Sequence, residues 1–136
     1  MLTRLSYMKV QPQVILDVGC GTGQHASLLQ QHYPHACIIA LDKQENFLQH
    51  ADETTEASCL LADTQQLPLR SHSVDMIFAN LVLPWCLDLQ KTLKEWQRVL
   101  RQDGLLMFTS LGPDTLRELM LHEHHTPNFF GYASFR

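Results

Sequence analysis

Residues 14–23, VILDVGCGTG, constrain the fold of this 136-residue chain more than any other stretch. The run VILDV is apolar and partly β-branched, so it predicts a buried strand, and the glycines after it predict a tight loop. Apolar residues at helical spacing follow as far as Tyr33, directly before Pro34. A strand that runs through a glycine loop into a helix brings backbone N–H groups to the helix start. This unit predicts an α/β domain with a ligand site at the end of the strand.

Further apolar runs predict more strands, which alternate with helices. They span residues 36–41, 57–62, 74–80 and 105–110. Helices are predicted over 44–51 and around 89–100, the second ending at a turn in which Gly104 suits a left-handed position. Because the runs are continuously apolar, helices should cover both faces of the sheet. The sequence therefore predicts an α/β, Rossmann-like, doubly wound and mostly parallel sheet of five strands in the order 3-2-1-4-5.

Overall composition indicates a globular chain, since 45% of its residues are hydrophobic and 18% are charged. A formal net charge of −4 excludes a broadly basic surface for nucleic acid or for an anionic membrane. No apolar run reaches the roughly 18 residues that span a bilayer. The first 13 residues lack the apolar segment of a signal peptide, so a cytoplasmic protein with reduced cysteines is expected.

Cysteine and histidine patterns predict no metal site. The 4 cysteines include no C-x-x-C pair. The cluster of His122, His124 and His125 reads HEHH, not the H-E-x-x-H of a zinc protease helix. We therefore expect free thiols, a solvated helix end and a protein that works without a metal ion.

Acidic and amide residues stand at the ends of the predicted strands, where parallel sheets bind ligands. Asp42 ends the second strand 19 residues after Gly23, close to the distance at which an acidic residue accepts hydrogen bonds from a ribose. Asp63 and Asn80 end the third and fourth strands. These residues, and Asp17 at the end of the first strand, also have structural alternatives. Asp17 could brace the glycine loop, Asp42 could cap the next helix, and Asp63 and Asn80 could be turn residues. Both sets of roles remain open at this point.

Spacing within the glycine loop distinguishes between nucleotide ligands. The loop reads G-x-G-x-G, one residue shorter than the G-x-G-x-x-G of dinucleotide-binding domains. A shorter loop suits a ligand without a pyrophosphate to cradle. This spacing disfavours a nicotinamide-dependent dehydrogenase.

Five blocks carry a resemblance to a known family: VILDVGCGTG, ALDKQENFL, LLADTQQLPL, VDMIFANLVLPWC and RVLRQDGLLMFTSLGPDTLREL. In this order, from about residue 10 to about residue 120, they resemble the class I S-adenosylmethionine-dependent methyltransferases. Within that superfamily, ANLVLPWC and FTSLGPDTLREL are similar to the malonyl-acyl-carrier-protein methyltransferases of biotin synthesis. A group of complex I assembly factors shares much of the pattern.

This resemblance implies a set of residues that bind S-adenosylmethionine. They are Asp17, Gly19, Cys20, Gly21, Gly23, Asp42, Lys43, Asp63, Thr64, Asn80 and Leu81. Asp17 would lie near the methionine amino group and Asp42 would hold the ribose hydroxyls. Asp63 would accept a hydrogen bond from the adenine amino group, while Asn80 and Leu81 would line the pocket beside the sulfonium. A carboxylate acceptor is nucleophilic at neutral pH, so no general base is needed and no catalytic residue is assigned.

The family also sets expectations for the chain as a whole. Residues 1–136 are expected to form a single S-adenosylmethionine-binding domain, short of most of the family's N-terminal lid and C-terminal strands. The implied function is O-methylation of a carboxylate, such as a malonyl thioester on acyl carrier protein. The alternative is a catalytically incomplete cofactor-binding module or assembly factor.

Expected partners are a small or carrier-linked acceptor, without nucleic acid or membrane. The edge of the fifth strand and the aromatic tail at 126–136 offer two surfaces for self-association. A last helix is predicted from Pro113 to about Met120.

Overall fold

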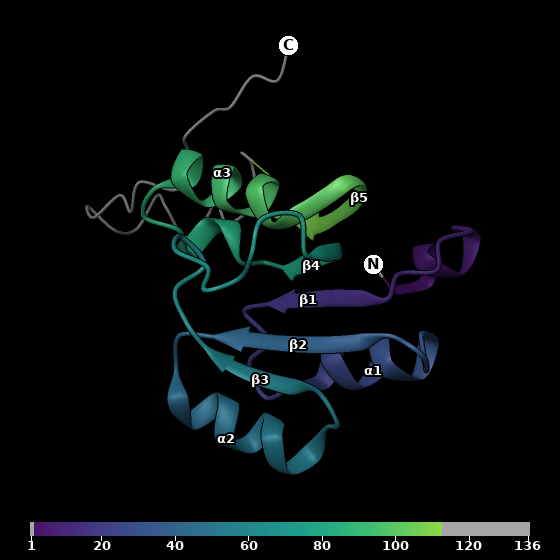
Figure 1. The fold of residues 1–136 in the computed structure, drawn as a ribbon. Helices are drawn as coiled ribbons and strands as arrows, with labels where there is room; N and C mark the ends of the chain where they lie inside the picture. Colours follow the sequence, from purple (N-terminus) through teal and green to yellow (C-terminus); the bar gives the residue numbers. More distant parts are fainter. Residues whose placement is uncertain (1, 113–136) are drawn as a thin grey trace.

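A computed structural model describes residues 2–112 and contains one parallel sheet in the order β3-β2-β1-β4-β5 (Figure 1). The strands are β1 (Val14–Val18), β2 (Cys37–Asp42), β3 (Ser58–Leu61), β4 (Val74–Asn80) and β5 (Leu100–Thr109). The helices are η1 (Leu2–Tyr7), α1 (Gln24–His32), α2 (Glu45–Thr54), η2 (Leu83–Trp85) and α3 (Leu89–Val99). All four strand pairs are parallel, so the carboxyl ends of the strands lie together, on the left in Figure 1. The predicted fold class and strand order are confirmed.

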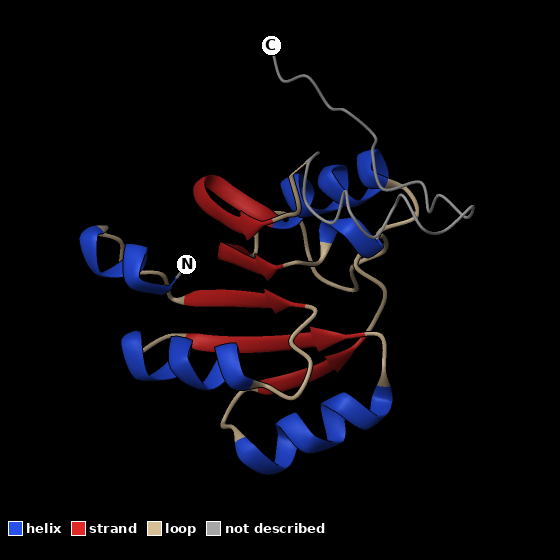
Figure 2. Ribbon diagram, turned by 180° about the vertical axis from the view of Figure 1, so that it is seen from behind, coloured by secondary structure: helices blue, strands red, loops and turns tan. Residues whose placement is uncertain are grey.

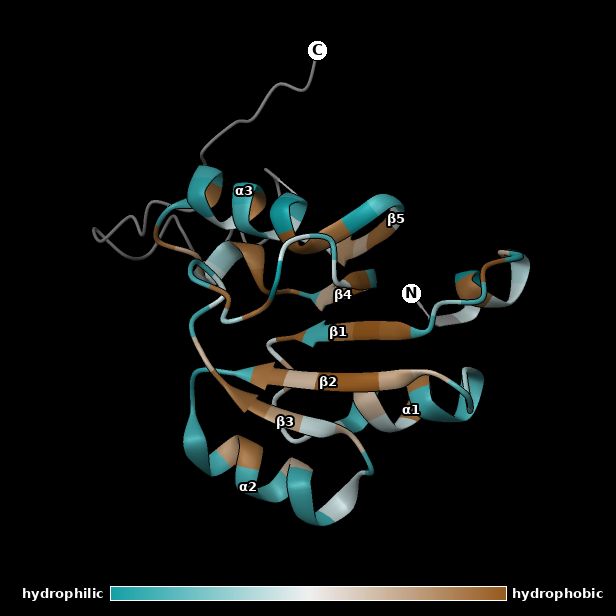
Figure 3. Cartoon of the chain, in the orientation of Figure 1, coloured by the Kyte–Doolittle hydropathy of each residue, from teal (hydrophilic) through white to brown (hydrophobic). Residues whose placement is uncertain are grey.

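Helices cover both faces of the sheet because every central strand is apolar on both sides. On one face, Ala26 of α1 and Leu48 of α2 pack with Ile15 of β1, and Figure 2 shows both helices on this face. On the other face, Trp96 of α3 packs with Leu16 of β1. In Figure 3 the strands are mostly hydrophobic, whereas α2 and α3 present mostly hydrophilic residues outward. The continuous apolar runs of the sequence thus become strands that are buried from two sides.

The start of β5 differs from the sequence prediction. This strand begins at Leu100, directly after α3, without an intervening turn. A register shift follows, since Val74 pairs with Leu100 whereas Met76 pairs with Leu105. Within this bulge Asp103, not Gly104, takes the left-handed conformation, with φ of 62°. Gly104 is required for space, because a Cβ there would lie 2.6 Å from Leu100 Cγ.

Polar contacts join three strands at the opposite, amino end of the sheet. Asp75 of β4 accepts hydrogen bonds at Oδ2 from the backbone N–H of Gln13 (3.0 Å) and Val14 (2.8 Å). Arg101 of β5 donates to Asp75 Oδ1 at 2.8 Å. Partial burial raises the pKa of Asp75, but the N–H groups of Val14 and Gln13 and the Arg101 guanidinium outweigh this and hold it below its usual value. These contacts set the register in which the strands reach the other end.

Three predictions concern residues outside the described part of the chain: the last helix from Pro113, the histidine cluster and the aromatic tail. The free thiols predicted for the cysteines are present at Cys20, Cys37, Cys59 and Cys86. Among the helices of residues 2–112, none is long and apolar enough to cross a membrane.

Candidate functional site

A cavity of about 580 Å³ opens at the carboxyl ends of β1, β2, β3 and β4. Its wall includes eight of the eleven predicted site residues: Gly19, Gly21, Asp42, Lys43, Asp63, Thr64, Asn80 and Leu81. The other three, Asp17, Cys20 and Gly23, do not line it. The topology thus brings together residues from four segments of the sequence that are far apart along the chain.

The glycine loop after β1 lies against the end of β2. Cys20 N–H donates to the Leu41 carbonyl at 2.9 Å, and Gly21 N–H donates to Asp42 Oδ2 at 3.0 Å. Gly21 has φ of 54°, a conformation that L-residues rarely adopt. A Cβ built on Gly21 would meet no protein atom within 4 Å, so it would enter the open space of the cavity. The loop is therefore shaped to let a ligand approach its backbone.

Asp42 is oriented by backbone groups on both of its oxygens. Oδ2 accepts from Gly21 and Oδ1 accepts from Gln44 N–H, each at 3.0 Å. The N-cap residue of α2 is Gln44, whose side chain makes no capping hydrogen bond, so Asp42 is not the N-cap residue itself, although it accepts from the N–H of that residue. An ionised carboxylate accepts about four hydrogen bonds. Each oxygen therefore retains capacity for one donor from a ligand, which matches the two neighbouring hydroxyls of a ribose.

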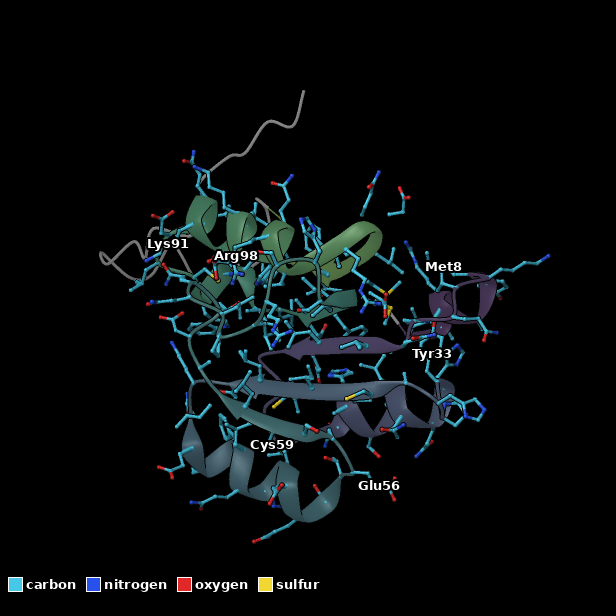
Figure 4. The ribbon with its side chains drawn as sticks, viewed as in Figure 1. Met8, Tyr33, Glu56, Cys59, Lys91 and Arg98 are labelled. Atoms are coloured by element: carbon cyan, nitrogen blue, oxygen red, sulfur yellow. The ribbon has the colours of Figure 1, made fainter. Side chains whose placement is uncertain are left out.

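The segment after β3 combines a turn with part of the cavity wall. Asp63 Oδ1 accepts from Gln65 N–H at 2.9 Å, so Asp63 serves the turn and the cavity together. Thr64 Oγ1 accepts from Trp96 Nε1 at 2.7 Å. Arg98, labelled in Figure 4, extends from α3 and donates to the carbonyls of Leu67 and Leu69, each at 2.9 Å. Helix α3 thereby holds this long loop in place from the other face of the sheet.

A left-handed turn after β4 supplies the remaining polar side of the cavity. Leu81 has φ of 56°, and its N–H donates to both the Thr109 carbonyl (3.2 Å) and Thr109 Oγ1 (3.0 Å). The Thr109 hydroxyl donates to Asn80 Oδ1 at 2.6 Å. Positive φ in a bulky residue such as leucine is unusual and needs support from its surroundings. Strand β5 supplies this support through Thr109.

Asp17 lies outside the wall of the cavity. Neighbouring residues of a strand point to opposite faces. Val18 therefore lines the cavity, whereas Asp17 is buried on the face of the sheet that α1 and α2 cover, with only 2% of its surface exposed. Its Oδ2 is buried without a hydrogen-bond partner in residues 2–112. Burial, and secondly the charge of Asp42, raise the pKa of Asp17 to about 7, against a smaller lowering by the Ala26 N–H.

The other two residues outside the cavity have packing roles. Cys20 belongs to the core, and burial followed by the charge of Asp17 raises its pKa to about 12, which makes it unreactive as a nucleophile. Gly23 has φ of 89°, and a Cβ there would lie 3.0 Å from Ala51 Cβ and 2.9 Å from Thr55 Cγ2. The missing side chain lets the start of α1 pack against α2.

Sequence analysis missed most of the apolar wall of the cavity. Besides Val18, the missed residues are the apolar Leu41, Phe47, Ala62, Val82, Cys86 and Leu87 and the polar Gln44 and Gln65. Trp85 also lines the cavity, and because 72% of its surface is exposed it is not a core residue. The exposed Leu87 carries a weak signal, an apolar residue in a segment between two elements. Such residues are found only once the loops are placed side by side.

Fold and site together define a Rossmann-like domain with a cavity at the strand ends, built on a glycine loop and an acidic residue after β2. The sequence profile of a family described as "Methyltransferase domain" matches residues 16–108. The chain belongs to this methyltransferase domain family.

Curated relatives narrow the comparison. The chain is 43% identical to a malonyl-[acyl-carrier protein] O-methyltransferase of Gallionella capsiferriformans, covering 88% of this chain and 44% of the relative. It is 39% identical to malonyl-[acyl-carrier protein] O-methyltransferase 1 of Coxiella burnetii, covering 88% of this chain and 41% of the relative. The chain thus spans less than half the length of these relatives.

Solved structures confirm the fold. A Haloferax volcanii putative methyltransferase, in complex with the Trm112 methyltransferase activator, gives a TM-score of 0.73 at 25% identity, over 78% of this chain and 49% of that one. The PH0226 protein from Pyrococcus horikoshii gives 0.71 at 24% identity, over 88% of this chain and 57% of that one.

Proposed function

We propose that residues 1–136 form a single cofactor-binding domain of an S-adenosylmethionine-dependent O-methyltransferase. The observation that carries this proposal is the pairing of the glycine loop with Asp42: Gly21 donates to one carboxylate oxygen while both residues line the same cavity. This geometry prepares an acceptor for ribose hydroxyls beside a loop open to close approach. The names of the curated relatives support the methyltransferase assignment and the class of acceptor.

The residues of the cavity fit the chemistry of S-adenosylmethionine. Its charged side chains are Asp42, Asp63 and Lys43, so the carboxylates outnumber the ammonium. A cationic sulfonium and ammonium favour such surroundings, and adenine and ribose supply donors to the carboxylates. Phe47 and Leu41 offer apolar surface next to Asp42. The space at Gly21 that a Cβ would fill is then available to the ligand.

When bound, S-adenosylmethionine supplies a methyl group: a carboxylate oxygen forms the new O–CH₃ bond while the S–CH₃ bond breaks, its electron pair stays on sulfur, and a neutral ester and thioether result. Asp42 would hold the ribose, and Asp63 with Thr64 would hold the adenine. Asn80 and Leu81 would line the side of the cavity where the acceptor arrives. Their contribution is orientation and exclusion of water, and no general base is assigned.

The proposed acceptor is the malonyl carboxylate of a thioester carried on acyl carrier protein, in biotin synthesis and in the cytoplasm. Support comes from the names of the relatives, which are malonyl-[acyl-carrier protein] O-methyltransferases. The same names do not favour the alternative of an inactive module or assembly factor. The proposed metal independence follows from the displacement chemistry, which needs no Lewis acid.

Calorimetry with S-adenosylhomocysteine tests the cofactor site. Wild type should bind, and Asp42→Ala should bind at least about tenfold more weakly because two ribose hydrogen bonds are lost. Asp52→Ala, on the exposed side of α2 and outside the cavity, is the matched control and should bind as wild type does. Equal affinity of the Asp42 variant and wild type would refute the ribose assignment.

Transfer of a labelled methyl group tests the reaction itself. The acceptor in this assay is a malonyl thioester, with the corresponding acetyl thioester as the control that lacks the carboxylate. Labelling of the malonyl compound alone supports O-methylation. A protein that binds S-adenosylhomocysteine but labels neither compound would revive the binding-module alternative.

A further inference from the structure

One hydroxyl group of β5 organises the acceptor side of the cavity. Asn80 and Thr109 are register partners at the ends of β4 and β5. Thr109 Oγ1 accepts from Leu81 N–H and donates to Asn80 Oδ1, at 3.0 and 2.6 Å. Asn80 and Leu81 both line the cavity, whereas Thr109 does not. Thr109 is therefore placed to act on a ligand through Asn80.

The orientation of the Asn80 amide follows from this contact. The 2.6 Å distance suits an O–H···O bond and is shorter than the usual N–H···O range of about 2.7–3.2 Å. The hydroxyl accepts from Leu81 N–H and has one proton to donate, which goes to Asn80 Oδ1. The amide oxygen thus faces Thr109, and the amide nitrogen is turned away from it.

Asn80 Nδ2 is available to a ligand. Within residues 2–112, no group accepts a hydrogen bond from it. It is also accessible, since the only buried side-chain polar atoms without a partner in this part of the chain are Asp17 Oδ2 and Tyr33 Oη. A half-buried amide nitrogen with two N–H donors in the wall of a cavity calls for an acceptor.

Beside Asn80 the proposed cofactor presents its sulfonium, which is cationic and accepts no hydrogen bond, while its own carboxylate would lie with the ammonium group at the methionine end, near the glycine loop. A carboxylate on the methyl acceptor would accept from Nδ2 instead, and it is a strong acceptor. We propose that Thr109 is a positioning residue that holds the Asn80 amide with its NH₂ group toward the carboxylate of the methyl acceptor. This assignment rests on the proposed function and extends it to acceptor selectivity: the site favours an anionic oxygen and disfavours a protonated amine.

Calorimetry on the full chain saturated with S-adenosylhomocysteine tests the assignment, with malonyl-N-acetylcysteamine as the probe. Thr109→Val keeps the shape of the side chain and removes the hydroxyl, whereas Thr109→Ser keeps the hydroxyl. Thr54→Val is the matched control, since its hydroxyl bonds the His50 carbonyl on the exposed side of α2. Thr109→Val should bind the probe about three- to tenfold more weakly, as expected for one hydrogen bond. Thr109→Ser and Thr54→Val should stay within about twofold of wild type.

Affinity for S-adenosylhomocysteine separates positioning from a general structural role. It should change less than the probe affinity in Thr109→Val, because Leu81 N–H keeps the Thr109 carbonyl as an acceptor. Unchanged probe affinity in Thr109→Val, or an equal loss for both ligands, overturns the assignment. A wild type that binds S-adenosylhomocysteine but not the probe overturns this assignment alone. A wild type that binds neither overturns the proposed function as well.

A measurement on wild type keeps the test independent of how Thr109→Val folds. The side-chain NH₂ signals of Asn80, identified by their loss in Asn80→Asp, should shift when the probe is added to the S-adenosylhomocysteine complex. The probe's acetyl analogue, which lacks the carboxylate, should leave them in place. Signals that do not respond to the probe contradict the proposed contact.

Discussion

The two ends of the sheet each hold an aspartate, and their surroundings shift its pKa in opposite directions. At the amino end, Asp75 accepts two backbone hydrogen bonds and an Arg101 ion pair, and its pKa is lowered. At the carboxyl end, Asp17 is buried, its Oδ2 has no partner in residues 2–112, and its pKa is raised to about 7. Both residues belong to central strands of the same sheet.

This difference separates a structural end from a functional end. Satisfied polar groups at the amino end stabilise the register of β1, β4 and β5. The carboxyl end instead holds a nearly buried carboxylate pair and an open cavity. Left-handed backbone at non-glycine residues does not distinguish the ends, since Asp103 adopts it at the amino end and Leu81 at the carboxyl end. Unsatisfied polar groups are typical of binding sites, where they prepare the protein for a ligand at the expense of stability.

The largest effect is expected from Gly23→Ala at the functional end. Its φ of 89° and the 3.0 Å contact with Ala51 Cβ make any side chain unfavourable, so we expect a loss of about 2–4 kcal/mol in the free energy of unfolding. Gly21→Ala meets open space and should lose only about 1–2 kcal/mol, from the backbone term alone. Urea unfolding of both variants measures the difference. Equal losses would show that packing against α2 is not the reason for a glycine at residue 23.

At the structural end, Asp75→Ala is expected to destabilise the protein by about 2–3 kcal/mol, because two backbone N–H groups lose their acceptor. The lowered pKa gives the pH dependence: this stabilisation is complete above the unfolded pKa of about 4 and is lost as the pH falls below it. Chemical unfolding at pH 7 and at pH 3 measures both terms. A loss as small as that of the exposed Asp52→Ala would remove the contrast between the two ends.

Asp17→Asn is expected to raise the free energy of unfolding, and Asp17 makes stability depend on pH in the opposite direction to Asp75. With a folded pKa of about 7, Asp17 retains its proton in the native state between about pH 4 and pH 7, where the unfolded chain has released it. Its contribution to stability is therefore present at low pH and falls as the pH rises through this window. Replacement by asparagine should stabilise the ligand-free protein at pH 8 by about 1–3 kcal/mol. Urea unfolding at pH 5 and pH 8 measures this, and the same pH slope in the variant and wild type would contradict it.

The smallest effect is expected from Arg101→Met. The Arg101 side chain is 45% exposed, and an ion pair so accessible to water contributes about 0.5 kcal/mol or less, reduced further by salt. Asp75 keeps its backbone donors in this variant. Thermal unfolding at low and high salt measures the effect. A loss comparable to that of Asp75→Ala would mean that the ion pair, and not the backbone contacts, stabilises the amino end.

The elements that could be predicted from sequence are those with a strong local signal. The strands at 14–18 and 74–80 are confirmed with the same bounds, because long apolar runs fix both the type of element and its length. The start of β5 was not predictable from Gln102, Asp103 and Gly104. This local pattern is typical of a turn, but pairing with β4 incorporates it into a bulge of the strand.

Part of the candidate site could also be predicted from the sequence. A glycine loop, and acidic residues after apolar runs, identified most of the polar wall at the correct end of the sheet. The apolar wall around Trp85 and the support from Thr109 were not identified. Their neighbours in the cavity are distant in sequence, and no spacing rule connects them.

By itself, the sequence determined a parallel α/β sheet, the end of that sheet at which the cavity opens, and the family, because these follow from apolar runs and the residues that end them. Only the tertiary structure decided which of two acidic residues faces the cavity. Asp17 and Asp42 both stand at strand ends, yet strand alternation and the packing of α1 bury the first, while the glycine loop turns the second toward the open space. It also decided how Asn80 is oriented, since its partner Thr109 lies on another strand, and only sheet pairing brings the two together.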